Sequence, residues 1–392
     1  MAIPRLRAFT GPAVLSYGFR PFFLLGALFA GGSILFWLPV YTGHAEPMTA
    51  FAPVDWHIHE MLFGYLPAIV TGFLLTAIPN WTGRLPVQGT PLLGLVLLWL
   101  AGRFAIFFSA AIGWQAAAVI DCAFLAAVAA AAATEIVAGR NWRNLKVLLP
   151  LAVLFSANVA FHFEAHTYGI SDWSRRLGIA AGIVLIMVIG GRIIPSFTRN
   201  WLVRANPGRL PAPFDRFDVS AILFSVIAFA LWVAAPDAFS TAIAMATAGV
   251  LNLARLSRWA GDRTIRDPLV LILHLAYLLV PTGFLLAAAA IVFPGQIAAA
   301  AGYHAFGTGA VGAMTLAVMV RATRGHTGGE LVAGRGGIAI FAAVLLAAVT
   351  RIVAAVGFPD ISLIHLSGAL WSAAFLGFAL LHGKALVTRR AR

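Results

Sequence analysis

The sequence is poor in charged residues, which make up 10% of its 392 residues, and it contains a single cysteine. A water-soluble fold of this length needs a charged surface, so this composition excludes that class. Cys122 stands alone, which excludes disulfides and cysteine-rich metal sites. Hydrophobic residues make up 61% instead, and they form repeated apolar runs of roughly the 20 residues that a bilayer requires.

These runs, bounded by proline, glycine and charge, predict an all-α integral membrane bundle of about twelve helices. Residues 1–392 form a single membrane domain in this interpretation, because no soluble segment of useful size remains. The predicted helices lie near residues 22–40, 57–78, 91–109, 113–138, 146–165, 173–194, 217–235, 238–256, 268–293, 301–320, 337–357 and 363–386.

Basic residues are concentrated in alternate loops between the predicted helices. They gather in the N-terminal segment, after each even-numbered helix and in the C-terminal segment, a set that includes Arg192, Arg255 and Arg321. Because Lys and Arg are enriched on the cytoplasmic side, both termini are predicted to be cytoplasmic. The net charge of +13 then reflects topology, with anionic membrane lipid as its partner and no nucleic acid.

Four arginines break this rule and fall in the predicted non-cytoplasmic third of their helices: Arg103, Arg175, Arg176 and Arg351. Arginines inside a membrane are rare and need an anionic partner. Two interpretations stay open. The arginines pair with nearby acidic residues such as Glu164 and Asp172, or they hold the propionates of a haem at the membrane edge.

Ten histidines are present, and imidazole is the commonest metal ligand. The same non-cytoplasmic half gathers His57, His59, His162, His166, His304 and His365. We therefore expect metal cofactors at that level of the bundle. His274 lies deeper toward the cytoplasm, where it is a candidate ligand of a second haem, and His326 follows the tenth helix on the cytoplasmic side.

The segment DWHIHEMLFGY, which starts at Asp55, carries the leading cluster. Asp55 is predicted to cap the helix. His57 and His59 point about 200° apart on an α-helix, so they are expected to serve two sites. His57 and Met61 share one face and suit copper, whereas His59 suits haem iron on the other face. Hydrogen bonding to neighbouring helices is the competing structural interpretation.

Two further helices add candidate ligands. His162 and His166 share a face with Asn158, which places this polar stripe toward the bundle interior. His304 opens a stretch of small residues, GTGAVGAM, that permits close approach of a helix or a flat macrocycle. His365 opens the last helix. For His166 and His304, solvation or packing remains the alternative to metal binding.

Long stretches of the chain resemble the NnrS family of bacterial membrane proteins: GFRPFFLLGALFA from Gly18, WHIHEMLFGY from Trp56, TGFLLTAIPNWTGR from Thr71, GGRIIPSFTRN from Gly190, HLAY from His274 and YHAFGTGAVGAMTLAVMVRATRGHTGG from Tyr303. The resemblance implies an inner-membrane metalloprotein of the nitric oxide response that binds haem, expected to be b-type, and copper. It places weight on His57, His59, Glu60, Arg192, His274, His304, Arg321 and His326.

Three functions follow as hypotheses, and whether the protein is an enzyme stays open. The first is a haem and copper protein that binds or converts nitric oxide or its adducts in denitrification or nitrosative stress, with an electron donor as partner. The second is a nitric oxide reductase or oxidase, although the sequence lacks an adjacent His-His pair. The third is a secondary transporter with Glu60, Asp121 and Glu135 as proton carriers, although the two halves show no convincing sequence repeat.

Overall fold

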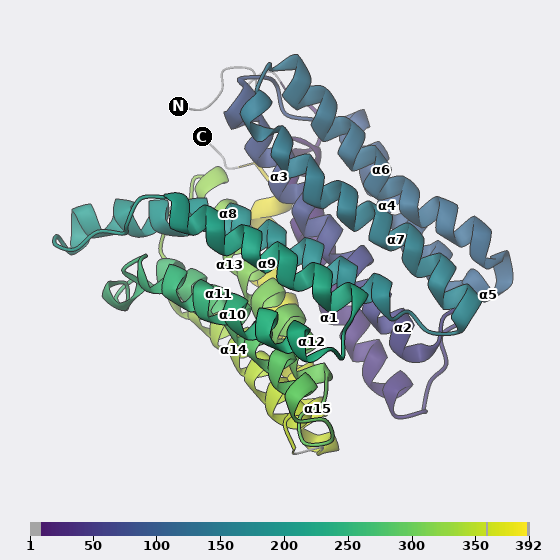
Figure 1. Cartoon of the computed structure of the whole chain (residues 1–392). Coiled ribbons are helices and arrows are strands. Elements are labelled where there is room, and N and C mark those ends of the chain that lie inside the picture. The colour runs from purple at the N-terminus through teal and green to yellow at the C-terminus, as the bar shows by residue number, and fades with distance from the viewer. Residues whose placement is uncertain (1–8, 358–359, 390–392) are drawn as a thin grey trace. The chain divides into compact units, whose positions relative to one another are not determined.

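The computed structural model describes residues 9–357 and 360–389, and the terminal arginines Arg5, Arg7, Arg390 and Arg392 lie outside these ranges. The fold is all-helical, with 80% helix and no strand in the described residues, as the sequence predicts (Figure 1). Twelve helices in that part of the chain are long and apolar enough to cross a membrane. The predicted cytoplasmic location of the termini stays a prediction.

The twelve spans follow one another with short connections, and two of them combine three helical segments. In chain order they are Phe19–Tyr41 (α1), Pro53–Thr82 (α2, η3 and α3), Thr90–Phe107 (α4), Trp114–Ala138 (α6), Trp142–Tyr168 (η4 and α7), Trp173–Ala205 (α8), Arg216–Ala234 (α9), Phe239–Ser257 (α10), Pro268–Val292 (α11), Ala300–His326 (α12, η6 and α13), Gly334–Ala355 (α14) and Ile361–Val387 (α15).

The second and tenth spans are interrupted by π-helical turns. In the second span, α2 (Pro53–His59) passes into the π-helix η3 (Glu60–Tyr65) and then into α3 (Leu66–Thr82). In the tenth span, α12 (Ala300–His304) passes into the π-helix η6 (Ala305–Gly312) and then into α13 (Ala313–His326). Such turns are rare and occur frequently at functional sites, which directs attention to both spans.

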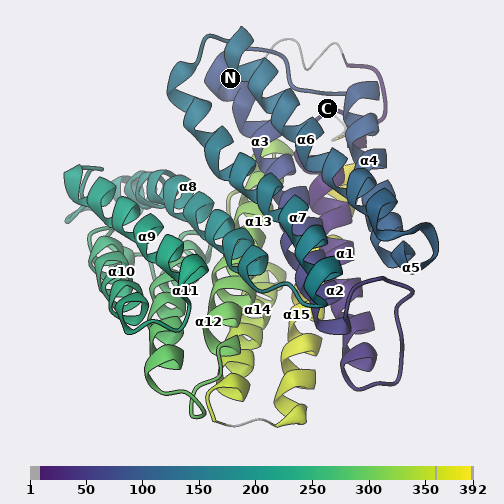
Figure 2. The same cartoon turned by 45° about the vertical axis from the view of Figure 1, so that its right-hand side comes forward.

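The chain divides into two compact units. The first comprises the described residues of Met1–Gly178, Ala322–Glu330 and Phe378–Arg392. Its α4, α6 and α7 (Leu148–Tyr168) lie side by side, and α1 packs against α3 (Figures 1 and 2). Glycines permit this close packing, since a Cβ on Gly72 would lie 2.7 Å from the ring of Phe23 and a Cβ on Gly26 would lie 2.6 Å from Ile69.

The second unit comprises Ile179–Arg321 and the described residues of Leu331–Gly377. Its α9, α10 and α11 pack in sequence order (Figure 2). A buried ion pair joins two of these helices, with Arg255 Nε 2.8 Å from the Asp218 carboxylate. The guanidinium also donates to the Tyr277 hydroxyl (2.7 Å) and to the carbonyl of Met187 in α8 (3.0 Å). One arginine thereby ties four helices together.

Several helix ends differ from the prediction. Arg192, Arg199 and Arg204 lie within α8 and not in a loop, and Arg321 and Arg324 lie within α13. Arg255 is buried within α10, although its charge was counted with the loop residues. Arginine is a good helix former, so a helix continues beyond the apolar stretch that hydropathy detects. With 33 residues, α8 is longer than the roughly 20 residues that cross a bilayer.

We expect Arg255→Leu to destabilise the protein by on the order of 3 kcal/mol, because Asp218 loses its principal buried cation. Thermal unfolding in mild detergent measures the effect as a lower midpoint. Arg209→Ala is the matched control, because Arg209 pairs with Asp262 at the surface (2.5 Å) and such pairs contribute about 0–1 kcal/mol. Equal midpoints for the two variants would contradict the structural role of Arg255.

Candidate metal centre

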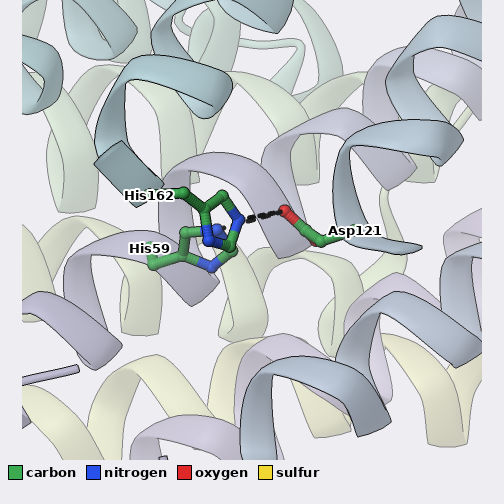
Figure 3. A group of neighbouring side chains, drawn as sticks. All are labelled: His59, Asp121 and His162. Atoms are coloured by element: carbon green, nitrogen blue, oxygen red, sulfur yellow. Dashed lines mark hydrogen bonds and ion pairs between the residues drawn. The ribbon is translucent and has the colours of Figure 1, made fainter. Parts of the chain in front are cut away.

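Three buried side chains from three helices converge inside the first unit. His59 is the last residue of α2, Asp121 lies in α6 and His162 lies in α7. Figure 3 shows both imidazole rings beside one another and facing the Asp121 carboxylate. Their exposed fractions are 0%, 2% and 2%, so the cluster is shielded from the surroundings of the bundle. Polar groups buried this deeply in a membrane protein indicate a functional site.

The ligand atoms of this cluster have the spacing of a metal site. Nε2 of His59 and Nε2 of His162 each lie 3.2 Å from Asp121 Oδ2, and one ligand atom from each residue lies within 4.8 Å of the others. Two atoms bound about 2.1 Å from one ion at the tetrahedral angle would be ~3.4 Å apart. Two nitrogens and one carboxylate oxygen therefore fit around a single cation.

Arg103 balances most of the negative charge beside this cluster. Its guanidinium, which projects from α4, donates to the carboxylates of Glu60 and Asp121. Two carboxylates against one guanidinium leave a formal charge of −1 with the imidazoles neutral. A bound cation or one protonated imidazole would offset this negative charge, and an uncompensated buried charge is costly in lipid.

Asn158 holds Asp121 in place from α7, one turn before His162. Its amide donates to Asp121 Oδ2 at 2.7 Å, and its carbonyl oxygen lies 3.1 Å from His59 Nε2. The buried Nδ1 of His59 has no hydrogen-bond partner in the described part of the chain. Buried polar atoms are rarely left in this state, so this nitrogen has the capacity to bind one further group.

Gly64 creates the space for the arginine. A Cβ at this position would overlap the Arg103 guanidinium, and the Gly64 carbonyl accepts a hydrogen bond from Trp99 Nε1 at 2.9 Å. Gly64 lies in the π-helical turn η3, which begins directly after His59. The irregular backbone therefore places the histidine and admits the arginine in the same stretch of chain.

A family profile described as NnrS protein matches residues 13–390, nearly the whole chain. The chain belongs to the NnrS family. No curated protein matched the sequence. The resemblance seen in the quoted stretches is confirmed, and the matched region contains every residue of the buried cluster.

Asp121 and Asn158 are the cluster residues of this NnrS-family chain that sequence reasoning did not treat as ligands. Asp121 was considered only as a proton carrier, and Asn158 only as part of the stripe with His162. Two features of the sequence could have indicated the role of Asp121. It is an acidic residue in an alanine-rich helix, and the preceding span contains Arg103, an arginine without an assigned partner in the sequence. An intramembrane arginine implies a carboxylate partner, and Asp121 and Glu60 are the partners that the structure provides.

The predicted copper pair of His57 and Met61 lies outside the cluster. The His57 ring stacks on Trp37, with ring centroids 4.7 Å apart and planes inclined by 9°. Met61 lies in η3 and is partly exposed. Asp55 does not cap the helix, since the capping position is Ala52. Asp55 instead accepts hydrogen bonds from the amide and hydroxyl of Ser171 (3.2 and 2.6 Å), because the helix starts earlier, at a proline.

Arg175 and Arg176 both pair with Asp172, at 2.8 and 2.7 Å, as the simpler of the two interpretations predicted. Burial of Asp172 works to raise its pKa, but hydrogen bonds from Arg176 and Arg175 outweigh it and hold the pKa below its ordinary value. Glu164 accepts from the backbone amides at the start of α8. These contacts fix the connection between α7 and α8.

The remaining candidates are distributed over both units. His274 lies 2.8 Å from the Thr198 hydroxyl, and the Arg321 guanidinium lies over the ring of Phe197 at 3.8 Å. His326 packs against Tyr17 and Phe19, and His166 stacks on Trp114. Four more lie apart in sequence from the cluster, on helices of the second unit: Arg192 on α8, His304 on α12, Arg351 on α14 and His365 on α15.

We expect Asp121→Asn to reduce the affinity of the cluster for a divalent metal at least tenfold, because the only anionic ligand of the triad becomes neutral. Elemental analysis of the purified protein after equilibration with copper measures the occupancy. Glu135→Gln is the matched control on the same helix, because Glu135 lies outside the cluster and pairs with Arg84 (2.6 Å). Equal copper content in both variants would contradict a metal site at Asp121.

Proposed function

We propose that this NnrS-family protein is a metalloprotein of the bacterial inner membrane that binds or converts nitric oxide or one of its adducts. Its role would lie in denitrification or in the response to nitrosative stress. The buried group of His59, Asp121 and His162 is the observation that supports this proposal. Family membership supports it as well.

Copper is the metal that we propose for this cluster. Two imidazole nitrogens and one carboxylate oxygen suit Cu(II), and the same set also binds Fe(II) or Zn(II). Three protein ligands leave a coordination position open, which is the arrangement of a metal site that accepts a small molecule. A redox-active metal held there would supply the position at which nitric oxide binds.

The surroundings of the cluster suit a small neutral gas. Aromatic rings enclose His59, with ring centroids 5.1 Å away at Phe51, 5.4 Å at Phe63 and 5.3 Å at Phe161. These rings exclude water and leave an apolar environment around the imidazole. Nitric oxide partitions into lipid and would reach such a site without an aqueous channel.

The polar side chains next to the metal ligands would hold these ligands in position. Asn158 and Arg103 both donate to Asp121, so the carboxylate that faces the histidines is oriented before any ligand arrives. Glu60 accepts from the same guanidinium and so helps to hold Arg103 beside the cluster. Haem, expected to be b-type, and an electron donor complete the proposal, and His274 and His304 are the candidate ligands of the haem.

The ion pairs weigh against the transporter alternative. The three carboxylates that it requires are each bonded to an arginine, namely Glu60 and Asp121 to Arg103 and Glu135 to Arg84. A carboxylate held in an ion pair takes up a proton only at the cost of that ion pair. Metal binding therefore accounts better for the buried charges.

The test is nitric oxide titration of the purified, copper-loaded protein, followed by electron paramagnetic resonance and visible spectroscopy. We expect a spectral change in the wild type and its loss in His162→Ala, because one metal ligand is missing. His166→Ala is the matched control one turn along α7, where the ring stacks on Trp114 with 4.3 Å between centroids. The same spectral response in His162→Ala and His166→Ala would overturn the proposal.

A further inference from the structure

The two interrupted spans share several features at one constant spacing. His59 and His304 each end the first helical segment, and the π-helical turns begin at the next residue, Glu60 and Ala305. At the same spacing, Gly83 and Gly328 follow the two spans with left-handed backbone, at φ of 70° and 76°. A left-handed glycine is a common helix end, but π-helical turns are rare, so their recurrence directly after a histidine in one register indicates a repeated structure.

The neighbouring helices repeat the same order. A continuous span precedes each interrupted one and packs against it, α1 in the first case and α11 in the second. The helix that follows packs against the π-helical turn, α4 against η3 and α14 against η6. Each of these third helices carries an arginine one turn before its last residue, Arg103 in α4 and Arg351 in α14. The fourth helices, α6 and α15, follow after short connections.

We propose that spans one to four and nine to twelve are two copies of one four-helix module, and that His304 is the ligand-binding histidine of the second copy. His59 fills this place in the first copy, where Asp121 and His162 complete a cation site. The second copy would then hold a second, chemically different ligand.

The acidic residues of the two modules differ, and this difference indicates the class of that ligand. The helices of the first module contain Asp55, Glu60, Asp121 and Glu135, whereas those of the second contain no acidic residue. Carboxylates offset the charge of a divalent cation inside a membrane, so the second module, whose helices carry none, suits such a cation less well than the first. His304 instead suits a metal complex that brings its own negative charge, of which haem with its two propionates is the example.

The backbone around His304 prepares its ring for a metal. Nδ1 lies 2.8 Å from the carbonyl oxygen of Ala300, which places the ring proton on Nδ1 and the lone pair on Nε2. One turn further, a Cβ added to Gly307 would meet nothing within 4 Å. The helix surface is therefore open at Gly307, on the turn that follows His304.

The inference rests on the proposed function in one respect, the choice of haem as the ligand. The test therefore uses protein from cells grown with excess haem precursor and measures haem as the pyridine haemochrome and copper by elemental analysis. We expect His304→Gly to lose one equivalent of haem and keep its copper, and Asp121→Asn to do the reverse. Added imidazole should restore the haem spectrum of His304→Gly, because free imidazole can replace the missing side chain.

His365→Gly is the matched control. Its Nδ1 lies 2.9 Å from the carbonyl of Ile361, the same local contact as in His304, but it stands outside the repeated register. Haem retained in His304→Gly, or lost equally in His365→Gly, overturns the second site. Loss that imidazole does not reverse, with unchanged thermal stability, overturns it too. A wild type that binds copper and nitric oxide but contains no haem overturns this inference and leaves the proposed function standing.

Discussion

The cost of placing charge in lipid governs where the polar side chains of this chain lie. Two buried arginines pair with carboxylates on other helices, Arg103 with Glu60 and Asp121, and Arg255 with Asp218. In the second unit, Arg255 and Asp218 balance each other in charge, and Tyr277 and a backbone carbonyl accept further hydrogen bonds from Arg255 Nη1. The group of Arg103, Glu60 and Asp121 keeps one excess negative charge, and that excess lies against two imidazoles. The same constraint that holds helices together thus produces a site for a cation.

Hydropathy was sufficient to predict the fold class and the number of spans, because an apolar segment of about 20 residues in a bilayer makes all its backbone hydrogen bonds within a helix. Hydropathy could not predict at which residues the helices end. Hydrogen bonding continues a helix beyond the apolar stretch, so Arg192 and Arg204 extend α8 although their side chains are charged. The π-helical turns were equally hidden, since EMLFGY and AFGTGAVG read as ordinary apolar helix.

Sequence reasoning named His59 and His162 among its ligand candidates but could not pair them. The spacing of His57 and His59 describes one helix, whereas the cluster joins α2, α6 and α7, whose order of packing no local pattern reveals. Asp121 entered only as a proton carrier for the same reason. Its significance depends on Arg103 and on two histidines from other helices, and contacts between helices are set by tertiary packing.

The repeat escaped detection because it does not divide the chain into halves. It relates the first four spans to the last four, with four further spans between them, so a comparison of one half with the other is out of register. Some corresponding positions are kept for their backbone conformation, because a left-handed glycine tolerates few substitutes. Others differ in charge, since Glu60 in the first copy corresponds to Ala305 in the second. A duplicated module that keeps the positions of its turns but differs in charge can hold two different ligands. The charged side chains determine which ligand is bound, and the turns determine where the ligand-binding histidine lies.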